Sequence, residues 1–416
     1  MQKKCLVQIN GCAYGSTGSI MQSIHTAAQQ AGWEAHMLCP NGRENQAAKK
    51  ASPEITFVGS WLEISAQRKW NKCTGWYGYG FCYTTTQILK QLDEWKPDVV
   101  QLHNLHHQYV DLQRLFGYIR ERKIPVVLTL HDCWAFTGHC AHFTMNNCEK
   151  WREHCDSCAY LSAYPLTLKD KTKENFYNKK RLFESLQNLV LSAPSQWIAD
   201  RAKESPMFYG RRIEVIYNGI NLTQSCVVAR QEIQDLRKRY APNNEWIVLA
   251  VSRFWTKEKG WDLLKELAAH LPAGIRLLAV GEAMENTKSA LPPAMTLIPP
   301  EKPMQLAKLY AAADVFVNFT REEVLGLVNV EALAAGIPVI TAPSGGAPEC
   351  IDSTSGIVLD ENSWECALAA IEKVRNGEIV FSKEACRQRA SAFDRRKKAK
   401  EHIQLYQEMC GEQEET

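Results

Sequence analysis

Two basic side chains stand where a predicted strand in the second half of the chain gives way to a helix. Residues 246–251 are apolar and rich in β-branched side chains, Arg253 follows them, and Lys259-Gly260 opens the next helical segment. A helix start offers unpaired N–H groups and a positive dipole end, which attract phosphate. Guanidinium and ammonium groups add charge-assisted hydrogen bonds. We therefore predict that Arg253 and Lys259 bind a diphosphate.

Two carboxylates mark a similar stretch further along the chain. Glu323 lies in the loop after the apolar run 315–320, and Glu331 lies inside a helix expected over residues 327–335, with Gly336 as its cap. Ligands of open α/β sheets bind beyond the carboxyl ends of the strands. Glu323 could therefore accept hydrogen bonds from sugar hydroxyls, and Glu331 from a ribose. The alternative is that Glu323 caps the helix and Glu331 is a solvated surface residue.

The start of this helix is a second phosphate-binding feature. Gly326, Leu327 and Val328 would present free backbone N–H groups at the positive end of the helix dipole. We expect them to contact the same diphosphate as the two basic residues.

These residues belong to a larger set of motifs that resembles the retaining glycosyltransferases of family 4, which have the GT-B architecture. The resemblance covers nearly the whole chain and is strongest over residues 217–360. The motifs are a glutamate pair, an Arg with a Lys-Gly pair, an Asn-Gly after a strand, and a Gly-Gly-x-x-Glu loop: Glu323, Glu331, Arg253, Lys259, Asn218, Gly219, Gly345, Gly346 and Glu349.

The resemblance implies an α/β fold of two Rossmann-like domains, each with a parallel sheet, that face each other across a cleft. The amino-terminal acceptor-side domain would span residues 1–220, with a Cys-rich insertion at 138–160. A nucleotide-sugar-binding domain would span 221–390, and 391–416 would form a helix that crosses back to the first domain. The alternation of strand-like and helical segments also favours parallel sheets covered by helices.

The resemblance also implies the reaction, in which a sugar passes from a nucleotide-diphosphate sugar to an acceptor hydroxyl with retained anomeric configuration. Attack would come from the front face, and the departing phosphate would take the acceptor's proton. Arg253 and Lys259 would neutralise the leaving group, commonly the largest catalytic effect, so no catalytic metal is expected. Ser252 and the Val324-Leu325 pair depart from the family pattern where the backbone approaches the donor, which leaves room for a different donor geometry.

A histidine ends a strand in the first half of the chain. Residues 126–130 form an apolar run that His131 follows. The resemblance implies that His131 contacts the transferred sugar, whereas the alternative is a side chain that closes its strand by donating to a carbonyl. His103, His106 and His107 follow another strand and are either structural or line the acceptor side.

A glycine-containing loop opens the chain. A strand at 5–10 runs into this loop, which carries Gly15 and Gly18. The resemblance implies a loop that approaches the donor and the acceptor. The alternative is an ordinary strand-to-helix turn with Ser16 or Thr17 as the cap.

Four cysteines lie close together in the sequence at 138–160 and end in a Cys-x-x-Cys pair: Cys140, Cys148, Cys155 and Cys158. Four thiolates suit tetrahedral Zn²⁺, so we predict a structural zinc site that orders the inserted loop. Such a closed site leaves no open position for chemistry. The alternative is four free thiols.

Composition limits the other classes of function. The chain has 416 residues, 45% of them apolar, and a net charge of +3, which is too small to indicate a nucleic-acid partner. No run approaches the ~20 apolar residues needed to span a bilayer, so a cytoplasmic protein is expected. The remaining cysteines should stay reduced there.

The acceptor substrate is indicated by a narrower resemblance. The segment around His131 and the four cysteines resembles bacterial enzymes of capsular or exopolysaccharide synthesis, of the colanic acid type. That resemblance implies a saccharide acceptor linked to polyprenyl diphosphate and contact with the cytoplasmic face of the inner membrane. Residues 61–83 are rich in aromatic and basic side chains, and residues 169–186 form a basic helix, so either segment could contact a membrane. The alternatives for residues 61–83 are an edge of the domain core or an acceptor cleft. The alternative for residues 169–186 is a solvated helix face.

Two other functions fit parts of the sequence. One is a different reaction on the same fold, such as a sugar-nucleotide epimerase or a phosphorylase. The other is a non-catalytic module that uses a zinc site for interactions.

Overall fold

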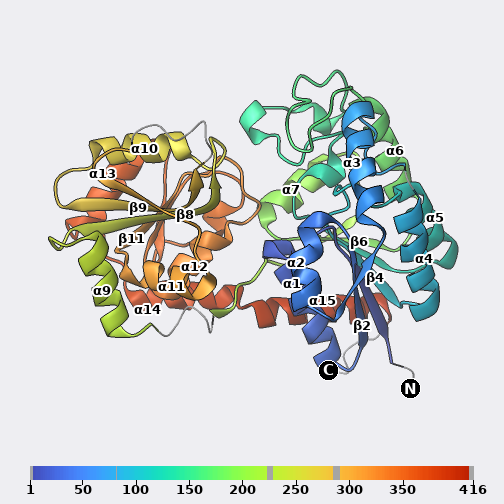
Figure 1. Ribbon diagram of the computed structural model, residues 1–416, viewed down its shortest axis with the longest axis horizontal. Helices are drawn as coiled ribbons and strands as arrows, with labels where there is room; N and C mark the ends of the chain where they lie inside the picture. The colour runs from blue at the N-terminus through green and yellow to red at the C-terminus, as the bar shows by residue number, and fades with distance from the viewer. Residues whose placement is uncertain (1–2, 81, 223–227, 284–290, 412–416) are drawn as a thin grey trace. The chain divides into compact units, whose positions relative to one another are not determined.

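The chain forms two compact units in the computed structural model, which describes residues 3–80, 82–222, 228–283 and 291–411 (Figure 1). The first unit comprises Met1–Tyr217 and Arg396–Thr416, and the second comprises Asn218–Arg395. The structural boundaries thus fall after Tyr217 and Arg395, a few residues from the expected ends of the domains at 220 and 390.

The first unit is built on a seven-stranded sheet in which every neighbouring pair is parallel, with strand order β3-β2-β1-β4-β5-β6-β7. The strands are β1 (Cys5–Ile9), β2 (Glu34–Pro40), β3 (Ile55–Val58), β4 (Val99–Leu102), β5 (Val126–Thr129), β6 (Leu189–Ala193) and β7 (Arg212–Val215). The order reverses between β1 and β4. Ile9 pairs with Leu102 and Leu102 with Leu128, so the carboxyl ends of β1, β4 and β5 meet at one edge.

The helices of this unit are α1 (Gly15–Gln30), α2 (Gln46–Ala51), α3 (Trp61–Thr74), α4 (Tyr83–Trp95), α5 (Leu112–Arg122), α6 (Thr172–Glu184), α7 (Gln196–Glu204) and α15 (Arg395–Met409). Short 3₁₀ turns occupy the loop after β5, at Trp134–Phe136, Thr144–Asn146 and Lys150–Arg152.

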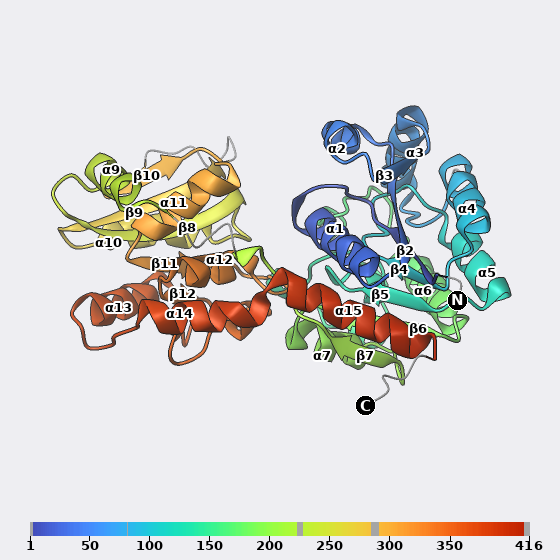
Figure 2. The ribbon, with the colours of Figure 1, turned by 90° about the horizontal axis from the view of Figure 1, so that it is seen from below.

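Helix α15 joins the core of the first unit although it comes last in the chain (Figure 2). Ile403 and Tyr406 pack in one apolar cluster with Ile20 and Ile24 of α1. The Tyr406 hydroxyl donates to Gln101 Oε1 at 2.7 Å, in the middle of the sheet. The expectation that a final helix returns to the first domain is therefore confirmed.

The second unit has a six-stranded parallel sheet of order β10-β9-β8-β11-β12-β13. Its strands are β8 (Trp246–Trp255), β9 (Ile275–Ala283), β10 (Met295–Ile298), β11 (Val315–Asn318), β12 (Val339–Thr341) and β13 (Gly356–Val358). Its helices are α9 (Arg230–Tyr240), α10 (Trp261–His270), α11 (Pro303–Ala312), α12 (Leu327–Ala335), α13 (Trp364–Arg375) and α14 (Lys383–Ala390). The predicted pair of parallel α/β sheets is thus confirmed.

Two local expectations need correction. The strand expected to end at residue 251 continues to Trp255, with a shift in its register against β9 between Val251 and Phe254, so Arg253 lies within β8. Lys179, which lies in the basic helix expected either to meet a membrane or to be solvated, is 1% exposed and donates to the carbonyl oxygen of Trp134.

Candidate functional site

Lys259 and Glu323 meet in the second unit, where two loops at the carboxyl end of the sheet come together. Lys259 Nζ lies 2.5 Å from Glu323 Oε2. Lys259 directly precedes Gly260, the N-cap of α10, whose φ of +74° and close approach to Phe319 leave no room for a side chain. The sequence assigned one of these residues to the phosphate and the other to the sugar, and the structure pairs them directly.

Arg321 holds the same two loops together and was missed by the sequence analysis. Its Nη1 and Nη2 donate to the two carboxylate oxygens of Asp262, at 2.7 and 2.8 Å. Its backbone N–H donates to Glu258 O at 2.8 Å. Although burial raises the pKa of Asp262, the hydrogen bonds and charge of Arg321 leave that pKa below its ordinary value. This planar two-point contact fixes the loop after β11 against the start of α10.

The Gly345-Gly346 pair fixes the backbone of Glu323. Gly346 N–H donates to Glu323 O at 2.8 Å. Gly345 has φ of +60°, and a Cβ there would lie 2.0 Å from Glu323 O. The motif therefore has a physical role, because only glycine lets the loop approach Glu323 so closely.

Helix α12 begins beside this loop. Gly326 is its N-cap with φ of +84°, so Leu327 and Val328 lie in its first turn, as expected. The fully buried Asn329 holds the turn: its Nδ2 donates to Thr341 Oγ1 and Ala347 O, both at 3.2 Å, and its Oδ1 accepts from Asn318. The sequence analysis did not select Asn329, although an amide inside an otherwise apolar helix could have indicated this contact.

Glu331 lies on α12 and is half-buried, unlike a solvated surface residue. The hydroxyl of Tyr310 donates to its Oε2 at 3.1 Å. Burial raises the pKa of Glu331, although the Tyr310 hydrogen bond and the Arg395 charge act in the opposite direction.

Arg253 is exposed on β8, and its guanidinium carbon lies 5.3 Å from the ring centre of Phe254. Its part in diphosphate binding stays a prediction, whereas the Lys259–Glu323 contact is a feature of the structure.

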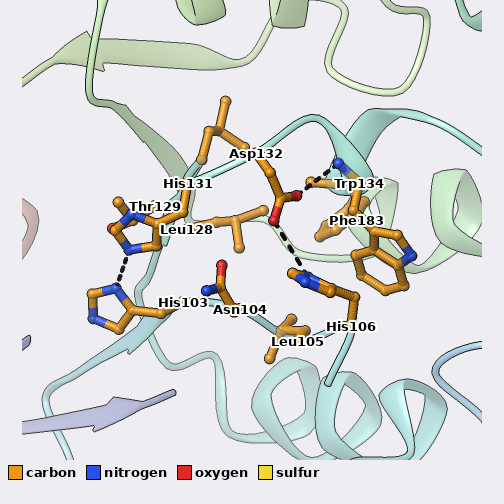
Figure 3. A pocket seen from close by; sticks show the side chains of 12 residues that line it. His103, Asn104, Leu105, His106, Leu128, Thr129, His131, Asp132, Trp134 and Phe183 are labelled. Carbon is orange, nitrogen blue, oxygen red and sulfur yellow. Dashed lines mark hydrogen bonds and ion pairs between the residues drawn. The ribbon is translucent and has the colours of Figure 1, made fainter. Parts of the chain in front are cut away.

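A histidine cluster lines a cavity at the carboxyl ends of β4 and β5 in the first unit (Figure 3). His103 Nδ1 lies 2.8 Å from His131 Nε2. His106 Nδ1 lies 3.5 Å from Asp132 Oδ2, while Asp132 Oδ1 accepts from Trp134 N–H at 2.9 Å. Burial lowers the pKa of His131 to about 4 and that of His106 to about 3, so both are neutral at pH 7. The Nε2 of His131 therefore pairs with the side chain of His103, whereas the alternative expected a backbone carbonyl as its partner.

The cap of the helix after the glycine loop differs from the cap that the alternative named. Helix α1 begins at Gly15 after the N-cap Tyr14, so neither Ser16 nor Thr17 is the cap. A Cβ on Gly15 would meet nothing within 4 Å, whereas one on Gly18 would lie 2.5 Å from the carbonyl carbon of Ala13. Gly18 is thus needed for internal packing, and the approach of Gly15 and Gly18 to a ligand stays a prediction.

The four cysteines of the insertion are free of disulfide bonds. Gly138 N–H donates to Cys155 Sγ at 3.1 Å, and Tyr160 N–H lies 3.4 Å from Cys158 Sγ. Burial and the neighbouring thiols raise the pKa of Cys140. In the described parts of the chain no group of three or more His, Cys, Asp or Glu is placed to hold a metal ion, and the zinc site stays a prediction.

Comparison with known proteins shows the family of the chain. Residues 18–224 match the family described as Glycosyltransferase Family 4, and residues 232–393 match Glycosyl transferases group 1. The chain belongs to glycosyltransferase family 4. It is therefore a glycosyltransferase of a retaining family that uses a nucleotide sugar, which decides against the epimerase, phosphorylase and non-catalytic alternatives.

Individual relatives are distant. A glycosyl transferase of Escherichia coli K12 named for colanic acid biosynthesis, WcaC, is 26% identical over 327 residues, which are 75% of this chain and 77% of that protein. A GDP-mannose-dependent alpha-mannosyltransferase of Mycobacterium tuberculosis is 34% identical over 150 residues, only 35% of this chain and 38% of that protein.

Solved structures share the GT-B fold. Sucrose-phosphate synthase from Thermosynechococcus elongatus has a TM-score of 0.72 at 16% identity, over 99% of this chain and 100% of that one. HepE of Anabaena, solved in complex with UDP-glucose, has a TM-score of 0.66 at 16% identity, over 96% of this chain and 99% of that one. None of the helices in the described ranges is both long and apolar enough to cross a bilayer.

Proposed function

We propose that this glycosyltransferase moves a hexose from a nucleoside diphosphate sugar to a saccharide carried on polyprenyl diphosphate, in the synthesis of a surface polysaccharide. The similarity to a colanic acid enzyme supports the acceptor class. The observation that carries the site assignment is the 2.5 Å contact between Lys259 and Glu323, held beside the start of α12 by Arg321 and the Gly345-Gly346 loop.

In the proposed mechanism the donor diphosphate takes the place of Glu323 as the partner of Lys259. Its oxygens accept hydrogen bonds from Lys259, Arg253 and the N–H groups of Leu327 and Val328. Glu323, released from the ammonium group, accepts hydrogen bonds from hydroxyls of the sugar. Glu331, fixed by Tyr310, binds the ribose.

The reaction then needs charge stabilisation more than a protein base. The bond between the anomeric carbon and the diphosphate oxygen breaks, and the acceptor oxygen bonds to the same face of that carbon. The acceptor proton passes to the departing diphosphate oxygen. Lys259 and Arg253 stabilise the negative charge that grows on the diphosphate. In oxyanion holes, which stabilise growing charge in the same way, the loss of one hydrogen-bond donor lowers kcat by about 10²–10³-fold. His131 orients the sugar.

A direct test supplies UDP- and GDP-hexoses with a lipid-linked saccharide and follows release of the nucleoside diphosphate. The wild-type protein should release it only when acceptor is present, and the product should keep the anomeric configuration of the donor. Lys259→Ala and Glu323→Gln should each lower kcat/KM by at least ~100-fold, while Lys257→Ala, an exposed neighbour, serves as the matched control. Full activity in both site variants would refute the assignment.

We also propose that the protein works at the cytoplasmic face of the inner membrane through one surface of the first unit. Leu166 and Leu168 are 40% and 65% exposed, and Leu168 N–H donates to the carbonyl of Lys72 at 2.8 Å. Apolar tips flanked by the exposed Lys72 and Lys169 suit an anionic bilayer surface. Binding to anionic vesicles should fall in Leu166→Ser/Leu168→Ser but not in Val380→Ser, which removes an 80% exposed side chain of the second unit.

A further inference from the structure

A chain of buried hydrogen bonds leads from the backbone of α1 to His131. Gln8 Nε2 donates to the carbonyl oxygen of Met21 at 3.1 Å. Gln8 Oε1 lies 3.4 Å from His103 Nε2, and His103 Nδ1 lies 2.8 Å from His131 Nε2. Gln8 and His103 are buried, whereas His131 is half-buried at the cavity. The last of these contacts is drawn in Figure 3.

The direction of every bond in this chain follows from its first member. A backbone carbonyl can only accept, so the amide NH₂ of Gln8 must face Met21 and the amide oxygen must face His103. An amide oxygen also only accepts, so His103 Nε2 carries a proton. A neutral imidazole has one proton, which leaves His103 Nδ1 as an acceptor. His131 Nε2 must then be the donor, and His131 Nδ1 carries the lone pair.

These hydrogen-bond directions hold for neutral rings, and the surroundings of both rings keep them neutral. The groups that act on His103 are the imidazoles of His131 and His402, together with its burial. All three lower the pKa of His103. Asp132 partly offsets the effect of burial on His131, but the pKa of that ring still falls to about 4. At neutral pH neither ring carries the second proton that would change the direction of these hydrogen bonds.

We propose that His103 is a positioning residue that holds His131 in the tautomer protonated on Nε2, so that Nδ1 of His131 accepts a hydrogen bond from a hydroxyl of the sugar. The sugar part rests on the proposed function, but the tautomer does not. The consequence is a specificity rule. Consider the sugar carbon whose hydroxyl faces His131. If that hydroxyl is replaced by hydrogen or fluorine, the sugar can no longer donate a hydrogen bond to Nδ1 of His131. If His131 instead carried its proton on Nδ1, a fluorine could still accept a hydrogen bond from it.

The tautomer is tested without any substrate. Full-length protein labelled with ¹⁵N in histidine is studied by long-range ¹H–¹⁵N correlation at pH 7.5, with the His131 signals identified from their loss in His131→Asn. The unprotonated nitrogen of a neutral ring resonates far downfield of the protonated one. We expect an Nε2–H ring at His131. A proton on Nδ1, or a charged ring, would overturn the proposal even if the enzyme transfers sugar as proposed.

Variants of His103 test the positioning role. His103→Leu removes the acceptor, so His131 should lose its single tautomer and kcat should fall about 10-fold, with a smaller change in KM. His103→Asn keeps an acceptor oxygen near the place of Nδ1, so it should restore both the single tautomer of His131 and kcat. His154→Gln, which changes a side chain that is 42% exposed, is the control. A His103→Leu protein that folds with an unchanged tautomer and unchanged kcat would refute the role. If His103→Leu does not fold, kcat of His103→Asn and the spectrum of the wild-type protein still test the positioning role of His103 and the tautomer of His131.

Donor analogues test the hydroxyl rule. Deoxy and fluoro donors at each position of the hexose are compared in the wild type and in His131→Asn. At the carbon that faces His131, both analogues should be slower by a similar factor, about 10-fold, and that penalty should shrink in His131→Asn. A fluoro donor as fast as the hydroxyl donor at every position would contradict an acceptor Nδ1. If the wild type turns over no nucleotide sugar, the proposed function fails and the tautomer result stands.

Discussion

Gly345→Ala isolates the contact that positions Glu323. Gly345 has φ of +60°, and an added Cβ would lie 2.0 Å from Glu323 O and 2.8 Å from Glu323 N. Both distances are below 3.0 Å, a limit that real Cβ contacts essentially never cross, and the opposing atoms are backbone. The loop must therefore move away from Glu323, and the hydrogen bond from Gly346 N–H to Glu323 O must lengthen.

The magnitude follows from three contributions. A left-handed conformation costs an alanine about 1–2 kcal/mol. Relief of the clash costs about 1–3 kcal/mol, and loss of the Gly346 hydrogen bond about 1 kcal/mol. We expect a total destabilisation of about 3–6 kcal/mol. A displacement of Glu323 by about 1 Å should also lower kcat/KM by about 100-fold.

The matched control is Gly377→Ala. Gly377 has φ of +75°, yet a Cβ there meets nothing within 4 Å, so this variant carries only the backbone contribution of about 1–2 kcal/mol. Urea unfolding gives both free energies of unfolding, and nucleoside diphosphate release gives both activities. Equal losses of stability in the two variants, or a fully active Gly345→Ala enzyme, would show that the Gly345 loop does not position Glu323.

Three further predictions concern single side chains. Arg321→Lys keeps the charge but loses the two-point contact with Asp262, so kcat/KM should fall about 10-fold; unchanged kinetics would contradict the positioning of the two loops by Arg321. Asn329→Leu leaves its buried partners unpaired and should lower the free energy of unfolding by about 2–4 kcal/mol, and a neutral result would mean that these groups find other partners. Burial lowers the pKa of Lys179 from 10.5 to about 7. Between these values the unfolded chain binds more protons than the folded one, so stability should rise from pH 7 towards pH 10 by about 3–5 kcal/mol relative to Lys179→Met. Parallel pH profiles of the two proteins in urea unfolding would refute this.

The sequence predicted best the features that depend on local chemistry. The apolar runs gave the buried strands, and Gly336 and Pro338 gave the end of α12 at Ala335. The two parallel sheets followed from the alternation of strands and helices. Lys259 and Glu323 were selected because both lie in loops at strand ends, and the topology of the sheet then brings those loops together.

Contacts between distant loops were missed, since spacing does not determine them. Arg321 meets Asp262 across 59 residues, and nothing in either loop marks that pairing. Lys179 lies in a helix whose other lysines are exposed or half-buried, and it is buried because the Trp134 carbonyl and ring, from 45 residues away, receive its ammonium group. The length of β8 was underestimated because the strand, after a shift in register past Val251, pairs with β9 again at Phe254 and Trp255.

The return of α15 to the first unit has a consequence for the order in which the protein is made. Residues 1–217 emerge from the ribosome before α15, yet the side chains that cover Gln101 and α1 come from Ile403 and Tyr406. The contiguous second unit can complete its core while the earlier unit still exposes the apolar face that awaits its last helix. During synthesis the amino-terminal unit is thus the later one to mature, and its unfinished sheet is the surface that a chaperone would most need to shield.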